Sequence, residues 1–153
     1  MASLARELFP DLPILGSTQM TINNLYGAKH LERMGFTRVI LARETPIREI
    51  RNIKANTNIE LESFVHGALC VSYSGQCLMS SMIGGRSGNR GRCAQPCRML
   101  YSIVDKEDNL VHDWDKRYVL SPKDLNTIEH LDEIIDSGIT SLKIEGRMKR
   151  PEY

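Results

Sequence analysis

The strongest constraint on the fold is a strand–helix unit that repeats along the first part of the chain. Short apolar segments typical of buried strands end near Thr18, Ala42 and His66, so the repeat is about 24 residues long. Leu120 and Ile144, in two later apolar segments, are separated by the same interval. Because strands that alternate with helices form a parallel sheet through right-handed crossovers, the sequence predicts an α/β fold.

Five strands and three amphipathic helices are expected from this pattern. The helices follow the start signals Asn23-Asn24, Thr45-Pro46 and Ser121-Pro122, and Gly35 and Gly138 would end the first and the third. The expected strands are 13–17, 38–42, 59–65, 118–120 and 141–145.

The number of expected strands falls short of a closed barrel. A complete (β/α)8 barrel has eight strands and typically about 250 residues. With five expected strands, residues 1–153 are predicted to form one incomplete domain, a partial TIM-like barrel, and an open sheet is the alternative. Both arrangements leave sheet edges that missing barrel segments or another chain would have to cover.

Residues 67–117 interrupt the repeat after the third expected strand. This insertion, rich in cysteine, glycine and arginine, is expected to contain a short helix at 72–82, a loop at 84–98 and a hairpin that pairs 100–104 with 110–114. Insertions that follow barrel strands lie on the catalytic face of the barrel. The chemistry of the protein is therefore expected in this segment.

Four cysteines lie within the insertion. Residues 1–13 are charged and lack the apolar core of a secretory signal, and no apolar run is long enough to cross a membrane. A cytoplasmic, reducing location is therefore expected, and there cysteines more often serve metal binding or catalysis than disulfides. The cysteines are Cys70, Cys77, Cys93 and Cys97, with the spacing C-x6-C-x15-C-x3-C.

The cysteine spacing favours an iron–sulfur cluster over zinc. Zinc ribbons and fingers use two pairs of ligands two to four residues apart, and here only Cys93 and Cys97 have that spacing. A [4Fe–4S] cluster accepts four thiolates at looser spacings. Zinc stays an alternative, and so does a set of buried reduced thiols, because free cysteine is common in protein cores.

Arginines surround the second cysteine pair. The loop 84–98 carries arginines and no acidic residue, so it could stabilise a negatively charged cluster or bind phosphate or carboxylate groups. The alternative is a solvated, flexible loop. The candidate anion-binding residues are Arg86, Arg90, Arg92 and Arg98.

Charged residues gather at the expected strand ends, which converge in a barrel. Carboxylates, a lysine and a histidine there could move protons, or they could form an ion-pair network that holds the sheet together. Gln19, Arg43 and Glu44 follow the first two strands. The candidate catalytic residues are Glu62, His66, Lys143 and Glu145.

Nucleic acid is a candidate partner only because of one local cluster of arginines and aromatic residues. The net charge is +1, so no global attraction to a polyanion is expected. Tyr73, Tyr101 and Trp114 lie near the arginine loop, and aromatic residues beside arginines suit single-stranded RNA. The same aromatic residues are equally at home in the packing of a hairpin.

Three segments resemble a known family. Residues 62–80, 90–98 and 141–149 are similar to the motifs of peptidase family U32. The resemblance implies two kinds of activity, because members were named for collagenase-like proteolysis and others take part in oxygen-independent hydroxylation of RNA bases or of a quinone precursor. It also implies a [4Fe–4S] cluster on Cys70, Cys77, Cys93 and Cys97, with prephenate as a co-substrate that donates oxygen.

The leading hypothesis is therefore an iron–sulfur-dependent enzyme that hydroxylates a tRNA or rRNA base. A peptidase that acts on a peptide substrate is the second hypothesis. It depends on His66 and Cys70, because the sequence has neither His-Glu-x-x-His nor Gly-x-Ser-x-Gly. A thiol that ligates a cluster cannot also be a free nucleophile. The third hypothesis is a non-catalytic RNA-binding or structural fragment.

Overall fold

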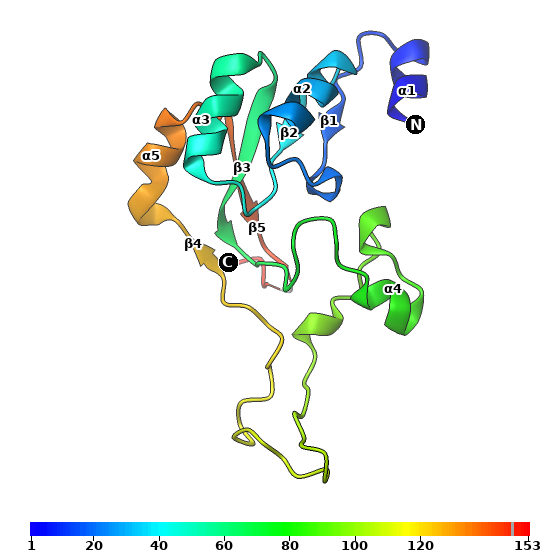
Figure 1. Cartoon of the computed structure of the whole chain (residues 1–153), viewed down its shortest axis with the longest axis vertical. Helices are drawn as coiled ribbons and strands as arrows, with labels where there is room; N and C mark the ends of the chain where they lie inside the picture. Colours follow the sequence, from blue (N-terminus) through cyan, green and yellow to red (C-terminus); the bar gives the residue numbers. More distant parts are fainter. Residues whose placement is uncertain (148) are drawn as a thin grey trace.

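The protein is described by a computed structural model that covers residues 1–147 and 149–153. Figure 1 shows a sheet with its helices above a long segment that extends away from the body. The helices are α1 (Ala2–Leu8), α2 (Leu25–Arg33), α3 (Ile47–Asn56), α4 (Met79–Gly84) and α5 (Leu131–Asp136). The strands are β1 (Leu15–Gly16), β2 (Arg38–Ile40), β3 (Glu60–Gly67), β4 (Leu125–Asn126) and β5 (Ser141–Glu145). Short 3-10 helices are η1 (Thr18–Met20), η2 (Gly88–Arg90), η3 (Pro96–Arg98) and η4 (Ile128–His130).

The five strands form one open sheet. Strands β1, β2 and β3 are parallel neighbours, and β5 runs parallel to β3 with Phe64 opposite Lys143. Strand β4 is antiparallel and pairs with the end of β3, where His66 lies opposite Asn126. The α/β class is thus confirmed, whereas the partial TIM-like barrel stays a prediction.

The core lies between the sheet and the helices α2 and α3. Leu31 and Ile53 from the helices and Val39 and Leu61 from the strands are at most 1% exposed. Burial of such a side chain contributes about 1.5–3 kcal/mol. The expected cap of α2 is also present, because Asn24 Oδ1 accepts a hydrogen bond of 2.9 Å from the Gly27 N–H. Among the described residues, no helix is both long and apolar enough to cross a bilayer.

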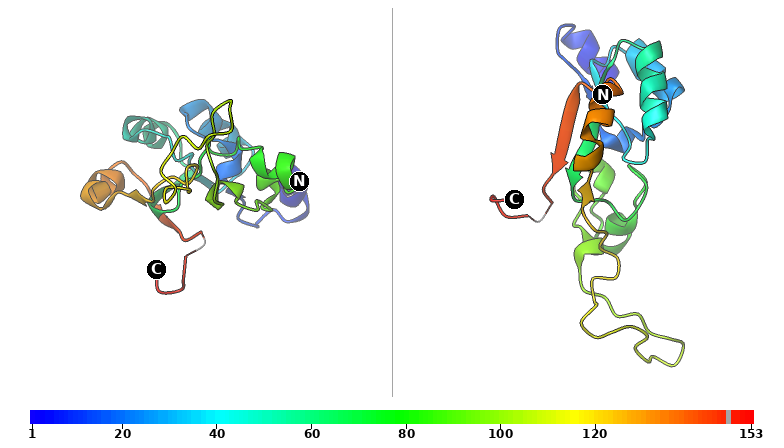
Figure 2. Two further views of the ribbon diagram at one scale, coloured as in Figure 1. Left: turned by 90° about the horizontal axis from the view of Figure 1, so that it is seen from below. Right: turned by 90° about the vertical axis from the view of Figure 1, so that its left-hand side faces the viewer.

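The opposite face of the sheet carries charge. Figure 2 shows α2 and α3 on one side of the strands, with β5 turned to the other side. Side chains alternate along a strand, so the neighbours of Val39 and Leu61 point away from these helices. There Arg38 lies 2.7 Å from Glu60 and 3.5 Å from Glu62, and Lys143 lies 3.5 Å from Glu62. A ladder of ion pairs therefore joins β2, β3 and β5.

The fourth strand differs from the expectation. Residues 118–120 were predicted as a strand and 122–137 as a helix, but 119–120 form a turn, β4 follows, and α5 begins only at Leu131. The Arg98 guanidinium donates to Ser121 Oγ and to the Pro122 carbonyl oxygen, which holds this segment against the cysteine loop. Thr127 donates through its amide and hydroxyl to the Val65 carbonyl oxygen. These tertiary contacts outweigh the local helix signal.

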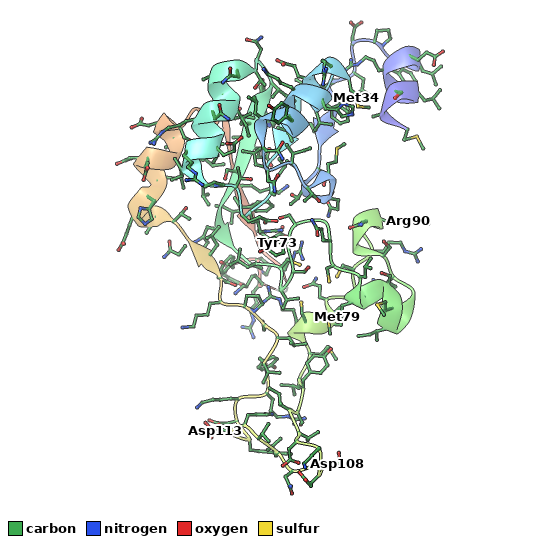
Figure 3. The ribbon with its side chains drawn as sticks, in the orientation of Figure 1. Met34, Tyr73, Met79, Arg90, Asp108 and Asp113 are labelled. Atoms are coloured by element: carbon green, nitrogen blue, oxygen red, sulfur yellow. The ribbon has the colours of Figure 1, made fainter. Side chains whose placement is uncertain are left out.

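The insertion is less regular than expected. The predicted helix at 72–82 is restricted to α4, because Ser74 is tied to other parts of the chain. The predicted hairpin is reduced to one bridge between Val104 and Leu110, with further backbone bonds around the turn. Figures 1 and 2 show this stretch as an arm that projects from the body. Figure 3 places Asp108 and Asp113 near its end.

We expect Gly67→Ala to destabilise the fold by about 3 kcal/mol, as chemical denaturation would measure. Gly67 has φ of +103°, and an added Cβ would lie 2.1 Å from the Glu145 carbonyl oxygen of β5. Gly84→Ala is the control, because no atom lies within 4 Å of its added Cβ. We expect it to be neutral or to stabilise by about 0.5–1 kcal/mol. Equal effects of both changes would contradict the close β3–β5 packing.

Candidate cysteine-lined site

A single cavity collects all four cysteines. It has a volume of about 180 Å³ and is lined by Cys70, Cys77, Cys93 and Cys97. Its other lining residues include Phe64 of β3, Glu145 of β5 and Met79 of α4. The cavity therefore lies where β3 and β5 end, the edge of the sheet at which the sequence predicts chemistry.

The other three cysteines affect the thiol of Cys97. All four are free and partly buried. Burial raises the pKa of the Cys97 thiol, Arg98 opposes that rise, and Cys70, Cys93 and Cys77 add to it.

The donor set fits an iron–sulfur group in its chemistry. Four thiols around one cavity are the ligands that such clusters use. In the described part of the chain, no three His, Cys, Asp or Glu side chains are grouped closely enough to hold a single metal ion.

Ser74 fixes the first cysteine segment to the sheet. Its N–H donates to Glu44 Oε1 at 2.9 Å and its hydroxyl to Glu44 Oε2 at 3.0 Å. The Ser74 hydroxyl also accepts from the Arg43 N–H at 3.1 Å, and its carbonyl oxygen accepts from the Thr21 hydroxyl at 2.8 Å. Ser74 is only 1% exposed. Four hydrogen bonds thus hold the loop between Cys70 and Cys77 over the ends of the first two strands.

The adjacent glycine allows this loop to approach the chain closely. Gly75 has φ of +73°, and a Cβ there would lie 2.6 Å from Thr21 Oγ1 and 2.7 Å from the Gln19 carbonyl oxygen. Only glycine meets both conditions without strain. Gly75 itself lines the cavity.

Two of the four predicted catalytic residues line the cavity. Lys143 and Glu145 are among its walls. Glu62 lies one contact behind them, with Oε1 at 3.5 Å from Lys143 Nζ and Oε2 bonded to the Ser141 hydroxyl. His66 is not among the lining residues, and its ring stacks on Tyr153 with centroids 5.6 Å apart. His66 is thus the predicted catalytic residue whose observed contact is an aromatic stack.

The four predicted anion-binding arginines do not line the cavity. Arg86, Arg90 and Arg92 are exposed and do not line it. Figure 3 shows Arg90 on the outer side of the cysteine segment. Arg98 uses its guanidinium on Ser121 Oγ and on the carbonyl oxygens of Leu69 and Pro122. Its observed contacts are thus those of a structural cross-link.

Two other arginines line the cavity instead. Arg43 Nη2 lies 3.5 Å from Glu145 Oε2, and Arg147 Nε lies 3.3 Å from Glu145 Oε1. The Arg43 guanidinium also lies over the Phe64 ring, 4.1 Å from its centroid. Sequence reasoning noted Arg43 only as a strand-end residue and did not single out Arg147. The alternation of Lys143, Glu145 and Arg147 was the available signal, since it places all three on one side of the chain.

We expect Glu44→Ala to loosen the Cys70–Cys77 loop. It removes the acceptor of two Ser74 hydrogen bonds, each with a net contribution of about 1 kcal/mol. Amide hydrogen exchange at Ser74 should accelerate about tenfold or more. Glu129→Ala, an exposed change on η4, is the control and should leave this exchange unchanged. Unchanged exchange at Ser74 in Glu44→Ala would contradict the anchoring role.

Comparison with known proteins finds relatives with two kinds of name, RNA hydroxylation proteins and a collagenase. It is 41% identical over 152 residues to tRNA hydroxylation protein P1 of Bacillus subtilis, with 97% of this chain covered. It is 43% identical over 144 residues to 23S rRNA 5-hydroxycytidine C2501 synthase of Escherichia coli, with 94% of this chain covered. It is 38% identical over 148 residues to a collagenase of Porphyromonas gingivalis, with 90% of this chain covered.

The relatives are much longer than this chain. The aligned part spans 36% of the B. subtilis protein, 22% of the E. coli protein and 36% of the P. gingivalis protein. No solved structure matches the chain. The family model of peptidase family U32 matches residues 1–153, and the chain therefore belongs to that family.

Proposed function

We propose that the protein takes part in the oxygen-independent hydroxylation of a tRNA or rRNA base, with a [4Fe–4S] cluster held by its four cysteines. The observation that carries the proposal is the cavity lined by Cys70, Cys77, Cys93 and Cys97. Two relatives bear names that state tRNA hydroxylation and rRNA 5-hydroxycytidine synthesis. Such a cluster would supply one-electron redox chemistry at the cavity wall.

The residues of the chain would orient substrates and move protons. Lys143 lies in the cavity wall with its ammonium 3.5 Å from Glu62 and 5.4 Å from the Phe64 ring centroid, so its position is fixed. Glu145 is held between Arg43 and Arg147 and is the lining carboxylate that could accept a proton. Prephenate is the co-substrate that we propose as oxygen donor.

A partial barrel would account for the placement of this site. The parallel strands β1, β2, β3 and β5 and the helices on one face are consistent with barrel architecture. On the side of β5 away from the ion pairs, Leu142 is 43% exposed and Ile144 is 66% exposed. We propose that further barrel segments or another chain cover these residues. The charged face would then line the interior of the barrel.

RNA would be bound by aromatic residues as well as by charge. Tyr73 and Trp114 are each 69% exposed. Figure 3 shows Tyr73 near the base of the sheet. The Arg117 guanidinium lies over the Trp114 ring, 5.0 Å from its centroid. Exposed aromatic rings and arginines are the elements on which unpaired bases stack.

A peptidase function is favoured by one observation, the likeness to a protein named collagenase. It would need a thiol nucleophile and a base. His66 stacks on Tyr153 and does not line the cavity that Cys70 lines. The geometry therefore supports the hydroxylation proposal better.

We expect protein purified without oxygen to be brown and to contain about four iron atoms and four sulfide ions per chain. Each of Cys70→Ser, Cys77→Ser, Cys93→Ser and Cys97→Ser should lower the iron content sharply. Ser102→Ala on the arm, a residue that is exposed, is the control and should retain it. The matching readout is mass spectrometry of tRNA and rRNA from a deletion strain that expresses each variant.

Three results would contradict this proposal. Colourless protein with one zinc ion would remove the redox centre. Gelatin hydrolysis that is lost in Cys70→Ser and His66→Ala would support the peptidase instead. RNA binding with a steep salt dependence but with no hydroxylated base in any strain would point to a non-catalytic RNA-binding module.

A further inference from the structure

We propose that Arg43, assisted by Arg147, forms a binding subsite for the carboxylate of a small organic acid inside the cysteine-lined cavity. The inference rests on the proposed function, because it names the substrate group that this cavity would hold beside the cysteines. It differs from the expectation that the arginines of the loop 84–98 bind the anion.

Arg43 has hydrogen-bonding capacity that the protein does not use. Its side chain is 11% exposed and it lines the cavity. Its buried Nε has no hydrogen-bond partner within the described residues, and its contact to Glu145 is long at 3.5 Å. A guanidinium presents five N–H donors in a planar fork. Buried donors are nearly always satisfied by protein or water, so an unused one in a cavity wall is available to a ligand.

The orientation of Arg43 is set before any ligand arrives. Its guanidinium lies over the Phe64 ring at 4.1 Å, and Phe64 is 6% exposed. Its backbone N–H donates to the buried Ser74 hydroxyl, so both ends of the residue are held. A fixed, planar fork suits the two oxygens of a carboxylate.

The charge of the cavity favours an anion. Its lining includes the cations Arg43, Lys143 and Arg147 but one carboxylate, Glu145, which contacts both arginines. Burial lowers the pKa of Arg43, with Arg147 adding to that effect, although a guanidinium stays protonated. A bound anion would offset the repulsion between the two arginines.

The size of the cavity selects the kind of anion. About 180 Å³ is less than the roughly 300 Å³ at which pockets for drug-sized ligands begin. Any group held by the thiols would reduce the space further. A small carboxylic acid therefore fits better than a nucleotide. The competing explanation is that the cations only balance the negative charge of the thiolates.

The test measures carboxylate binding to metal-free protein, so that it does not depend on a cluster. Succinate, benzoate and prephenate are titrated by calorimetry, with inorganic phosphate and AMP as comparison anions. We expect at least one carboxylate to bind more tightly than phosphate or AMP. Arg43→Gln should weaken that binding about tenfold or more, and Arg43→Lys should restore part of it.

Arg90→Gln is the matched control, because Arg90 is exposed and lies outside the cavity. It should bind carboxylate as the unaltered protein does. Phenylglyoxal labelling of the unaltered protein, mapped by mass spectrometry, adds a readout that needs no variant: the bound carboxylate should protect Arg43. Absence of protection, loss of binding in Arg90→Gln alone, or preference for phosphate would each overturn the subsite. Carboxylate binding by a protein that takes up no iron would keep the subsite and reject the cluster.

Discussion

The hydrogen bonds around Ser74 are the interaction on which the candidate site depends. The cysteines of the first pair lie in a segment without regular structure, so nothing in the local backbone fixes their positions. Glu44 and Thr21, which follow the first two strands, bind Ser74 from two directions. Because Ser74 is buried and makes four such bonds, it fixes the position of this irregular loop in the cavity wall. The second pair is held in turn, because the Ala94 N–H donates to the Ser80 hydroxyl of α4 at 2.9 Å.

A series of ion pairs and cation–π contacts connects the sheet to this wall. It begins at Arg38 and Glu62, passes through Lys143 and the Phe64 ring, and ends at Glu145 with its two arginines. Partly buried ion pairs of this kind position side chains more than they stabilise the fold. The cavity wall therefore carries positively charged side chains beside the four thiols. This arrangement suits a negatively charged group bound in the cavity.

The sequence predicted the parts of the molecule that local periodicity controls. The α/β class and the helices around Leu31 and Ile53 are confirmed, because burial of an apolar stripe decides them. The strand at 118–120 was wrong, because the contacts of Arg98 across the fold, invisible in sequence, determine that segment. The cysteine spacing indicated a shared site, but no local signal showed that Arg43 would line it in place of the exposed Arg90.

Iron K-edge X-ray absorption of the protein purified without oxygen tests most directly whether the four thiols share one inorganic centre. A shared centre should give every iron sulfur neighbours, together with a second shell of iron at short range. This signal should disappear when any one of Cys70, Cys77, Cys93 and Cys97 is replaced. An isolated ion with no metal neighbour, or a metal content that these replacements do not change, would show that the four thiols do not share one inorganic centre.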